Sequence, residues 1–412
     1  MGKLDCSEER LSLSLFLQQH PDSELLLEIT KVLPHESMSE TILLVGNVTI
    51  YHKDFENKKT KFFGKLRFKD NYPIDNSLLI EENIYSSIIN KLASLDITPN
   101  VITYITTINI PNFRHYIHFK FPQFFGEISK QIQELHDKVP SLDFENATLV
   151  LLELGEGYTL HKMMNMINFD DLNKIIFQTL YTLYNFALIG LLHNDLHTGN
   201  VFIEILDYPI DLIYFTDEDT YFTIKTRYIA KIFDFDLSFY CEPSAKDCFE
   251  NTRVNNLDDI GLRNNKIVLN KNDKFDLFLF LCTLYKSDID QKIKDNIIRK
   301  IITVEKLLDY NWEFACRLSN ITYKKNNPTH AYNTGTYVPT SEQIINFSNI
   351  FGGEIFGEYK HSLQEEGFPF SKSECHIYIS QNVNAEKVME NITNEQEKLE
   401  RPETPEAGLW FL

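Results

Sequence analysis

Positive charge is scarce in this chain of 412 residues. Lys and Arg number 40 against 59 Asp and Glu, so the formal net charge is −19 at pH 7. Proteins that bind nucleic acid do so mainly by neutralising phosphates with Lys and Arg. The charge balance therefore argues against a general DNA- or RNA-binding protein, whereas it would suit a basic partner or a basic substrate.

Cysteine motifs and long apolar runs are also missing. The six cysteines form no CxxC pair and have no zinc-finger spacing. No apolar run approaches the roughly 18–20 residues that cross a bilayer, and the N-terminal sequence has no apolar segment of the signal-peptide type. Because scattered cysteines suit a reducing compartment, we expect a soluble, intracellular protein without a membrane span.

Apolar periodicity divides the chain into parts of different character. Val, Ile and Thr are frequent in stretches that predict strands, whereas a 3.6-residue apolar period predicts helices. The predicted strands are 41–51, 58–68, 101–110, 148–154 and 229–239, with a hairpin at 211–226. The predicted helices are 77–95, 169–190 and 275–285, with short helices in 7–30. No clear pattern covers 111–145, and the charged C-terminal sequence predicts disorder.

Three polar residues stand at a spacing typical of phosphoryl transfer. His193 to Asn200 read HNDLHTGN, so Asp195 and Asn200 are five residues apart after a helix and before a strand. In the kinase pattern, the Asp acts as base and the Asn binds metal. Downstream, the apolar stretch before Asp234 leads into a lone carboxylate, and a buried carboxylate is costly unless it is paired or metal-bound. Asn200 and Asp234 are therefore candidate metal ligands, and Asp195 is the candidate catalytic base.

A cation for the phosphates is expected further upstream. Glu81 lies on the helix predicted over 77–95, where it can pair with a lysine of the preceding strand. Lys65 and Lys69 both qualify, since they share a strand face with Arg67. Lys65 is favoured because Leu66 and Phe68 continue the strand after it.

Each of these residues also has an ordinary interpretation. Asp195 and Asn200 suit a turn, Asp234 could end a strand, and Glu81 could lie on a solvated helix face. The order of the elements favours catalysis: lysine, glutamate, apolar strand, long helix, HxD…N, strand and FD.

With these motifs, the sequence resembles the protein kinase superfamily, in an atypical, haspin-like branch. It is also similar to serine/threonine-protein kinases of large DNA viruses. The resemblance implies an α+β, two-lobed fold that binds ATP and Mg²⁺, or Mn²⁺. Its parts would be a helical extension (1–38), a small β-rich N-lobe (39–154), a larger helical C-lobe (155–375) and a polar, disordered tail (376–412). A viral origin would place the protein in the host cytoplasm or the virion.

The resemblance assigns further residues. His197 stands where protein kinases usually have a Lys, two residues after the catalytic Asp. Glu153 and Leu154 would contact the adenine through backbone groups, and Gly46 would lie near the phosphates. Asp276 would cap the backbone of the catalytic loop from a buried helix.

Several kinase features are nevertheless absent from the sequence. It contains no GxGxxG, Asp236 replaces the Gly of the usual DFG, and no APE follows. A serine/threonine protein kinase, acting on a protein that could be basic, is the first hypothesis. The alternatives are a small-molecule kinase of the aminoglycoside or choline type, which shares HxDLHxGN, and a non-catalytic pseudokinase scaffold. The sequence leaves the oligomeric state open.

Overall fold

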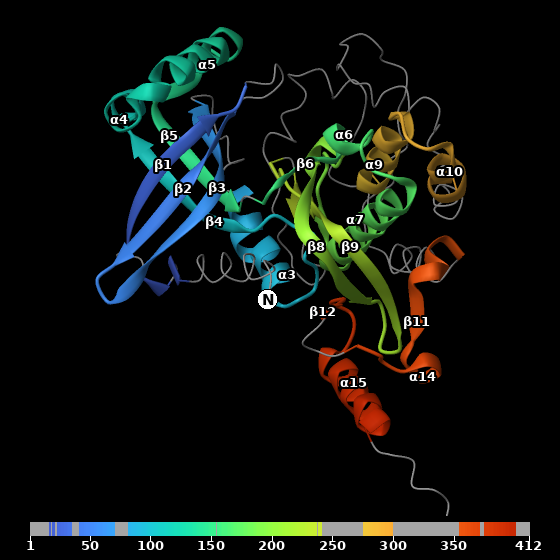
Figure 1. The fold of residues 1–412 in the computed structure, drawn as a ribbon. Helices are drawn as coiled ribbons and strands as arrows, with labels where there is room; N and C mark the ends of the chain where they lie inside the picture. Colours follow the sequence, from blue (N-terminus) through green and yellow to red (C-terminus); the bar gives the residue numbers. More distant parts are fainter. Residues whose placement is uncertain are drawn as a thin grey trace, which may run out of the picture.

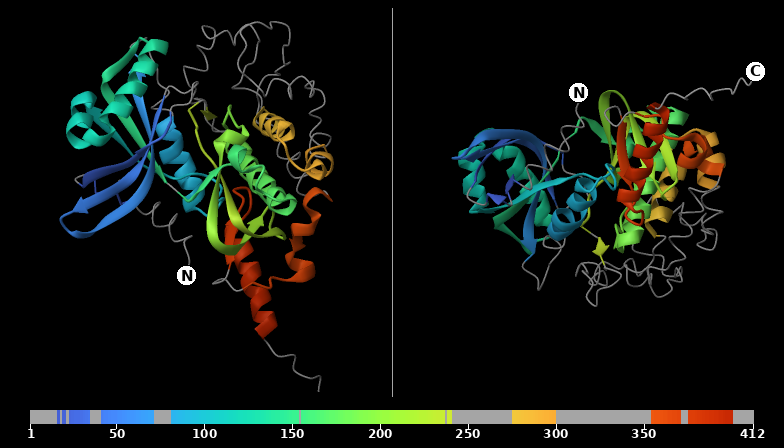
Figure 2. Two further views of the ribbon diagram at one scale, coloured as in Figure 1. Left: turned by 45° about the horizontal axis from the view of Figure 1, so that its top comes forward. Right: turned by 90° about the horizontal axis from the view of Figure 1, so that it is seen from below.

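The chain folds into a mixed α/β structure with two sheets. A computed structural model describes residues 16–34 (without 18, 21 and 22), 41–70, 81–240 (without 154 and 237), 275–299, 354–370 and 375–400. A β-rich N-terminal part and a C-terminal part with a second sheet and most of the helices lie next to each other (Figure 1). Helix α3 lies between the two parts, as the views of Figure 2 also show.

The N-terminal part is an antiparallel sheet in the order β1-β2-β3-β5-β4. Its strands are β1 (Glu24–Val32), β2 (Ile42–His52), β3 (Phe55–Asp70), β4 (Tyr104–Pro111) and β5 (Leu142–Glu153). Side chains of β2 alternate between buried and half-buried positions, as the period-2 pattern of the sequence predicts. The predicted strands over 41–51, 58–68, 101–110 and 148–154 are confirmed as strands, with bounds that differ by a few residues at most ends.

Helices α4 (Phe113–Lys120) and α5 (Phe125–Lys138) cover one face of this sheet, with the 3-10 turn η2 (Pro122–Phe124) between them. Their buried residues recur every three or four positions and share a core with β2, β3 and β5; they are Phe113, Ile117, Ile128, Ile132 and Leu135. Apolar residues at this spacing form one stripe on a helix. These two helices occupy the region for which the sequence predicted no element.

A helix over residues 81–94 links the sheet to the C-terminal part. It contains a π-helical turn, η1 (Ile84–Ile89), before α3 (Asn90–Ser94). Its apolar face joins the largest core of the molecule, which α7 shares. The Asn90 side chain donates to the Tyr104 carbonyl at 2.9 Å and accepts its N–H at 2.8 Å. These two bonds fix the helix to β4 and place Glu81 against the sheet.

The C-terminal part contains the second sheet, in the order β11-β9-β8-β12, with β6 also paired to β8. Its strands are β6 (Gly157–Thr159), β8 (Val201–Phe215), β9 (Thr220–Ile232), β11 (Lys360–Ser362) and β12 (Cys375–Ile379). β8 and β9 form one long hairpin, which is longer at both ends than the predicted 211–226 and takes in the start of the strand predicted over 229–239. Among the described residues of this part, strands therefore take a larger share than the sequence predicted.

Helix α7 (Phe169–Ile189) packs against β9 and is buried along most of its length. Its N-cap, Asn168, accepts the Asp171 N–H at 2.9 Å, and its bounds agree with the predicted helix. Around it lie α6 (Leu160–Met163), β7 (Leu191–Leu192), η3 (Thr198–Asn200), β10 (Phe239–Tyr240), α9 (Phe275–Lys286), α10 (Gln291–Ile293) and η6 (Lys294–Ile298). None of the helices in the described ranges has both the length and the apolar character needed to cross a membrane.

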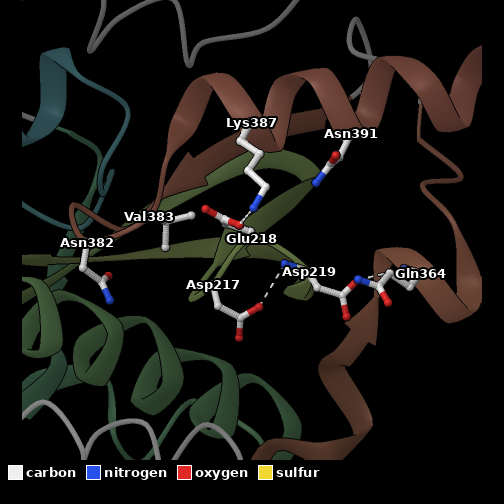
Figure 3. Close-up of a pocket in the computed structure, with 8 residues that line it drawn as sticks. All are labelled: Asp217, Glu218, Asp219, Gln364, Asn382, Val383, Lys387 and Asn391. Carbon is white, nitrogen blue, oxygen red and sulfur yellow. Dashed lines mark hydrogen bonds and ion pairs between the residues drawn. The ribbon is translucent and has the colours of Figure 1, made fainter.

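Of the last described elements, η8 (Glu354–Tyr359) lies against α7, where the Asn173 side chain donates to the Tyr359 hydroxyl at 3.1 Å. The tip of the β8–β9 hairpin is surrounded by β11, α14 (Leu363–Glu366), β12 and α15 (Ala385–Glu400). The Asp219 carboxylate accepts the Ser362 hydroxyl and the Gln364 N–H, each at 2.8 Å. Lys387 of α15 forms an ion pair with Glu218. A pocket beside the hairpin tip is lined by Asp217, Glu218, Asp219, Gln364 and Lys387, among others (Figure 3). Its carboxylates serve as turn, cap and ion-pair partners of neighbouring elements.

Two predictions about the ends of the chain were wrong. Residues 24–32, expected within a helical extension, form strand β1, because pairing with β2 overrides the helical appearance of their Leu run; Leu26 is consequently 51% exposed. Part of the expected disordered tail forms β12 and α15. Val388 and Ile392, one helical turn apart, are fully buried in a small core with the hairpin. Val388 and Ile392 thus dock the charged helix, together with the partly buried Met389.

Candidate active site

The candidate catalytic loop, residues 193–200, runs from β7 into η3. The backbone N–H groups of His193 and Asn194 both donate to the Asp276 carboxylate at 2.7 Å. Asp276 lies in the first turn of α9 and is buried, which raises its pKa. The expected cap of this loop by Asp276 is confirmed. The two bonds hold the loop where Asn194 takes a left-handed conformation, with φ of 64°.

The ring of His193 is a fixed structural part of the loop. Its Nε2 lies 2.8 Å from the Phe233 carbonyl, and its Nδ1 accepts the Asp195 N–H at 3.3 Å. The ring is fully buried, and burial lowers the pKa of His193. A neutral ring with its proton on Nε2 satisfies both contacts and ties the loop to the strand end before Asp234.

Asp195 and Asn200 contact each other as their spacing predicts. The Asn200 amide nitrogen donates to the Asp195 carbonyl at 2.8 Å and lies 3.4 Å from its Oδ2. The amide oxygen of Asn200 is therefore the atom that can face a cation. Burial, and next the charges of Asp236 and Asp234, raise the pKa of Asp195 well above its ordinary value. A carboxylate with a raised pKa is a stronger base for a hydroxyl proton.

His197 places a ring nitrogen beside this carboxylate. Its Nδ1 accepts the Gly199 N–H at 2.9 Å, and its Nε2 lies 3.8 Å from Asp195 Oδ2. A side chain at Gly199 would meet the His197 ring at 2.6 Å, so this position needs a glycine. Burial lowers the pKa of His197. A neutral His197 with Nδ1 accepting has its proton on Nε2 and offers a donor at the site.

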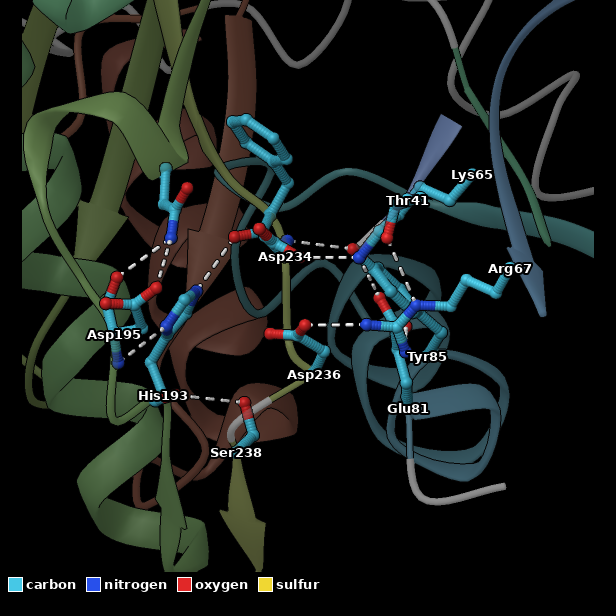
Figure 4. A network of polar contacts seen from close by, with 12 residues as sticks. Thr41, Lys65, Arg67, Glu81, Tyr85, His193, Asp195, Asp234, Asp236 and Ser238 are labelled. Atoms are coloured by element: carbon cyan, nitrogen blue, oxygen red, sulfur yellow. Dashed lines mark hydrogen bonds and ion pairs between the residues drawn. The ribbon is translucent and has the colours of Figure 1, made fainter. Parts of the chain in front are cut away.

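Asp234 faces the loop from the end of β9 and contacts the N-terminal sheet (Figure 4). Its φ of 72° is left-handed, and its N–H donates to the Tyr85 hydroxyl at 3.0 Å. Its Oδ1 lies 2.5 Å from Lys65 Nζ. Burial would raise the pKa of Asp234, but the charge and hydrogen bond of Lys65 outweigh burial and lower it to about 2. Asp234 is thus held as an anion.

Lys65 and Arg67 present their charges side by side on β3. Lys65 Nζ lies 2.6 Å from Glu81 Oε1, and Arg67 Nη1 lies 2.9 Å from Glu81 Oε2. Arg67 Nη2 also contacts Asp236 Oδ2 at 2.6 Å. Burial alone would lower the pKa of Lys65, but Asp234 and Glu81 raise it, so the lysine stays charged. For Lys69, the alternative candidate, the structure describes only the strand position and not the side chain.

Glu153 lies at the end of β5 but takes part in a separate charge cluster. Its side chain is buried and forms an ion pair with Lys231 of β9, which also contacts Glu204 of β8 at 2.9 Å. The Thr103 hydroxyl donates to Glu153 at 2.7 Å. These contacts join β5 to the hairpin. The Glu153 N–H itself donates to the Thr103 carbonyl at 2.9 Å, and the expected contact of this backbone with an adenine stays a prediction. Leu154, expected to act with it, lies outside the described residues.

Gly46 lies within β2, opposite Ile29 of β1 and Phe62 of β3. A side chain there would come within 2.3 Å of the Glu28 carbonyl oxygen. The close approach of β1 explains this glycine without a phosphate, and the expected contact with a cofactor stays a prediction.

The donors available at the site suit Mg²⁺. Asp234 Oδ2 and the Asn200 amide oxygen are hard oxygen ligands, and Mg²⁺ in phosphate-transferring sites is held by one or two such groups plus substrate phosphates and water. Within the described ranges, no three His, Cys, Asp or Glu side chains are grouped as a metal site. A cation here would therefore depend on phosphate oxygens for the rest of its ligands.

Four charged residues of these clusters had no predicted role: Arg67, Asp236, Lys231 and Glu204. The alternation of Lys65 and Arg67 along a strand with apolar neighbours was the available signal for the first. In the sequence, Asp236 stands out only because it replaces the glycine of DFG. Because an ion pair between distant strands leaves no local pattern, the contacts of Lys231 could not be found from the sequence.

Comparisons with known proteins leave the family open. No protein-family model matches the chain, and no curated protein matches it. Among solved structures, one similar chain is WaaP in complex with acyl carrier protein. The two are 10% identical with a TM-score of 0.34, over 72% of this chain and 90% of that one. The case for a function therefore depends on the geometry of the site.

Proposed function

We propose that the protein is an ATP- and Mg²⁺-dependent phosphotransferase with a two-lobed, protein-kinase-like fold, and that it phosphorylates a serine or threonine hydroxyl of a protein. The observation that carries the proposal is the meeting of Lys65, Glu81 and Asp234 in one ion-pair cluster beside the Asp195–Asn200 pair. These residues come from β3, the 81–94 helix, the end of β9 and the loop after β7. A non-catalytic scaffold has no evident need for all of these residues together.

The chemistry assigns one task to each group. The hydroxyl oxygen of the acceptor attacks the γ-phosphorus of ATP, the bond from that phosphorus to the bridging oxygen breaks, and ADP leaves. Asp195 orients the hydroxyl and accepts its proton, while the Asn200 amide holds Asp195 in place. Lys65, oriented by Glu81, provides positive charge for the phosphates. The Nε2–H of His197 can donate to the transferred phosphoryl group.

Asn200 and Asp234 would hold Mg²⁺. The ion would neutralise the phosphate charge when bound. The low pKa of Asp234 keeps this carboxylate ionised at any physiological pH.

A protein acceptor is favoured by the net charge of −19, which suits a basic polypeptide. The resemblance of the catalytic loop to haspin-like kinases points to the same substrate class. A small alcohol or aminoglycoside is the other acceptor that this loop pattern would accommodate. Retention of the full set of charged residues argues against a non-catalytic scaffold.

The test is transfer of radiolabelled γ-phosphate from ATP with Mg²⁺ to generic basic and acidic proteins, beside a panel of small alcohols and aminoglycosides. Asp195→Asn should lower transfer by about 10²–10⁴-fold, the usual contribution of a general base. Asp137→Asn, at an exposed aspartate of α5, is the matched control and should transfer like the wild type. Binding is read separately as a Mg²⁺-dependent thermal shift with ATP, which Asp234→Ala should remove.

Label on protein that Asp195→Asn loses would support a protein kinase. Label on a small molecule would show that the acceptor is a small molecule and would leave the assignment of the site residues unchanged. Transfer that survives in Asp195→Asn would refute the assignment of the base. Binding of ATP without transfer to any acceptor would favour a scaffold.

A further inference from the structure

Among the described residues, Arg67 is the cation that bridges the 81–94 helix and the segment after Asp234. It lies two residues after Lys65 on the same face of β3 and is buried. One arm of its guanidinium, Nη1, meets Glu81, and the other, Nη2, meets Asp236. Its Nε is 3.5 Å from the Thr41 hydroxyl at the start of β2. The planar fork is thereby fixed in one orientation.

The cluster consists of two parallel pairs that share Glu81. Lys65 contacts Asp234, Arg67 contacts Asp236, and each cation also contacts one oxygen of Glu81. The two aspartates are two residues apart in one turn, so the turn is attached to β3 at two points. Buried charges are tolerated only when they are paired in good geometry. Each contact therefore constrains the position of the others.

The turn needs such attachment because its backbone is unfavourable. Asp234 has a left-handed φ of 72°, which residues with a side chain rarely adopt. Phe235 anchors the middle of the turn by packing against Tyr85 and His193, with ring centroids 5.2 and 4.9 Å apart. Asp236 is the third attachment point of the turn. Kinases usually have a freely rotating glycine at this position, whereas this chain has an ion pair with Arg67.

We propose, on the basis of the proposed function, that Arg67 is a positioning residue. Its ion pair with Asp236 would hold Asp234 in the orientation that binds the metal. The function of Arg67 then depends on its two-armed shape and not only on its charge. A lysine carries the same charge on a single point and cannot reach Glu81 and Asp236 together in this way. The Arg67→Lys variant keeps the positive charge and removes the two-armed geometry, so it separates the contribution of charge from that of geometry.

Arg67→Lys is compared with Arg114→Lys, a matched change at an exposed position of α4. Because displacing a reacting group by about 1 Å can cost about 100-fold in rate, Arg67→Lys should lower kcat by tenfold to about 100-fold. It should also raise the Mg²⁺ concentration for half-maximal activity. Binding of adenosine, measured without Mg²⁺ by calorimetry, should be unchanged. Arg114→Lys should leave all three quantities unchanged.

The path through Asp236 is tested with Asp236→Asn and with the double variant. If Arg67 acts through Asp236, the double variant should lose no more activity than the worse single variant. The same cycle in urea unfolding should show coupling between the two positions. An Arg67→Lys protein with wild-type kcat and Mg²⁺ dependence would overturn the inference, as would losses that multiply in the double variant. Loss of adenosine binding together with activity would also overturn it, since that result indicates a general structural role.

Failure of the proposed function gives a different result. If the wild-type protein transfers no phosphate and shows no Mg²⁺-dependent ATP binding, the proposed function is wrong and the catalytic role of Arg67 is wrong with it. If the wild type is active and Arg67→Lys matches it, only the inference about Arg67 is wrong.

Discussion

Replacing Lys231 by methionine should destabilise the protein strongly. Lys231 Nζ is held between Glu153 and Glu204, at the junction of β5 with the β8–β9 hairpin. The side chains of Lys231 and Glu153 are 6% and 1% exposed. Methionine keeps the length of the side chain and its apolar part but removes the charge. The variant therefore leaves two carboxylates in a buried site without their cation.

Two estimates give the range of stability that Lys231→Met should lose. Burial would lower the pKa of Lys231, yet Glu153 and Glu204 raise it from 10.5 to about 12. A shift of this size corresponds to about 2 kcal/mol of stability. Because the folded-state pKa is the higher one, this stability is complete below about pH 10.5 and is lost as the pH rises through 12. Breaking a buried pair by removing one partner costs about 3–5 kcal/mol. We therefore expect Lys231→Met to lose between about 2 and 5 kcal/mol of stability.

Lys225 provides a control on the same strand. It forms an ion pair with Asp211 of β8 at 3.6 Å, as Lys231 does with Glu204 of the same strand, but the Lys225 side chain is 69% exposed. Exposed ion pairs contribute about 0–1 kcal/mol. Urea unfolding at pH 7.5, followed by circular dichroism, should therefore place the midpoint of Lys231→Met well below that of Lys225→Met, whose midpoint should stay near the wild-type value.

Equal losses in the two variants would refute the reasoning, because they would show that burial does not decide the cost. A second comparison uses Lys231→Met with Glu153→Gln. Removing one of the uncompensated charges should restore part of the lost stability. A double variant that is less stable than Lys231→Met alone would contradict the electrostatic cause.

Two further predictions concern the catalytic loop. Asp276→Asn should lower the free energy of unfolding by about 1.5–3 kcal/mol, because its amide NH₂ would face one of the two N–H donors of His193 and Asn194; urea unfolding measures the loss, and an unchanged midpoint would contradict the cap. The acid limb of kcat/KM should lie above the ordinary aspartate pKa, since burial and next the charge of Asp236 raise the pKa of Asp195, which must lose its proton to act as base. A pH profile of transfer tests this, and a limb at the ordinary aspartate value of about 3.9 would count against it.

Much of the fold could be predicted from local patterns. The strands over 41–51 and 58–68 and the helix over 169–190 are long and strongly periodic, and their existence and type are confirmed. Predictions were wrong where the partner of a segment decides its structure. Residues 24–32 become a strand only because β2 pairs with them, and α15 is held by a core assembled from distant segments.

The contacts of the candidate site likewise fall into those that a local pattern predicts and those that depend on distant segments. Contacts encoded at short range, such as Asn200 with Asp195, could be predicted because the spacing itself sets the geometry. Contacts across the chain could be predicted only where a known pattern named the residue types, as for Lys65 with Glu81. Arg67 with Asp236 joins residues 169 positions apart and belongs to no such pattern.

The parallel pairing of β12 with β8 has a consequence for synthesis on the ribosome. All strands of the N-terminal sheet come from the first 153 residues, so this sheet can form while the rest of the chain is being made. The second sheet cannot be completed until residue 379 has been made, because residues 211–215 pair with 375–379. Until β12 emerges, the edge of β8 presents unpaired backbone groups that can join neighbouring nascent chains. We therefore expect chaperones to protect this edge during translation, and a premature stop before residue 375 to yield an aggregating product.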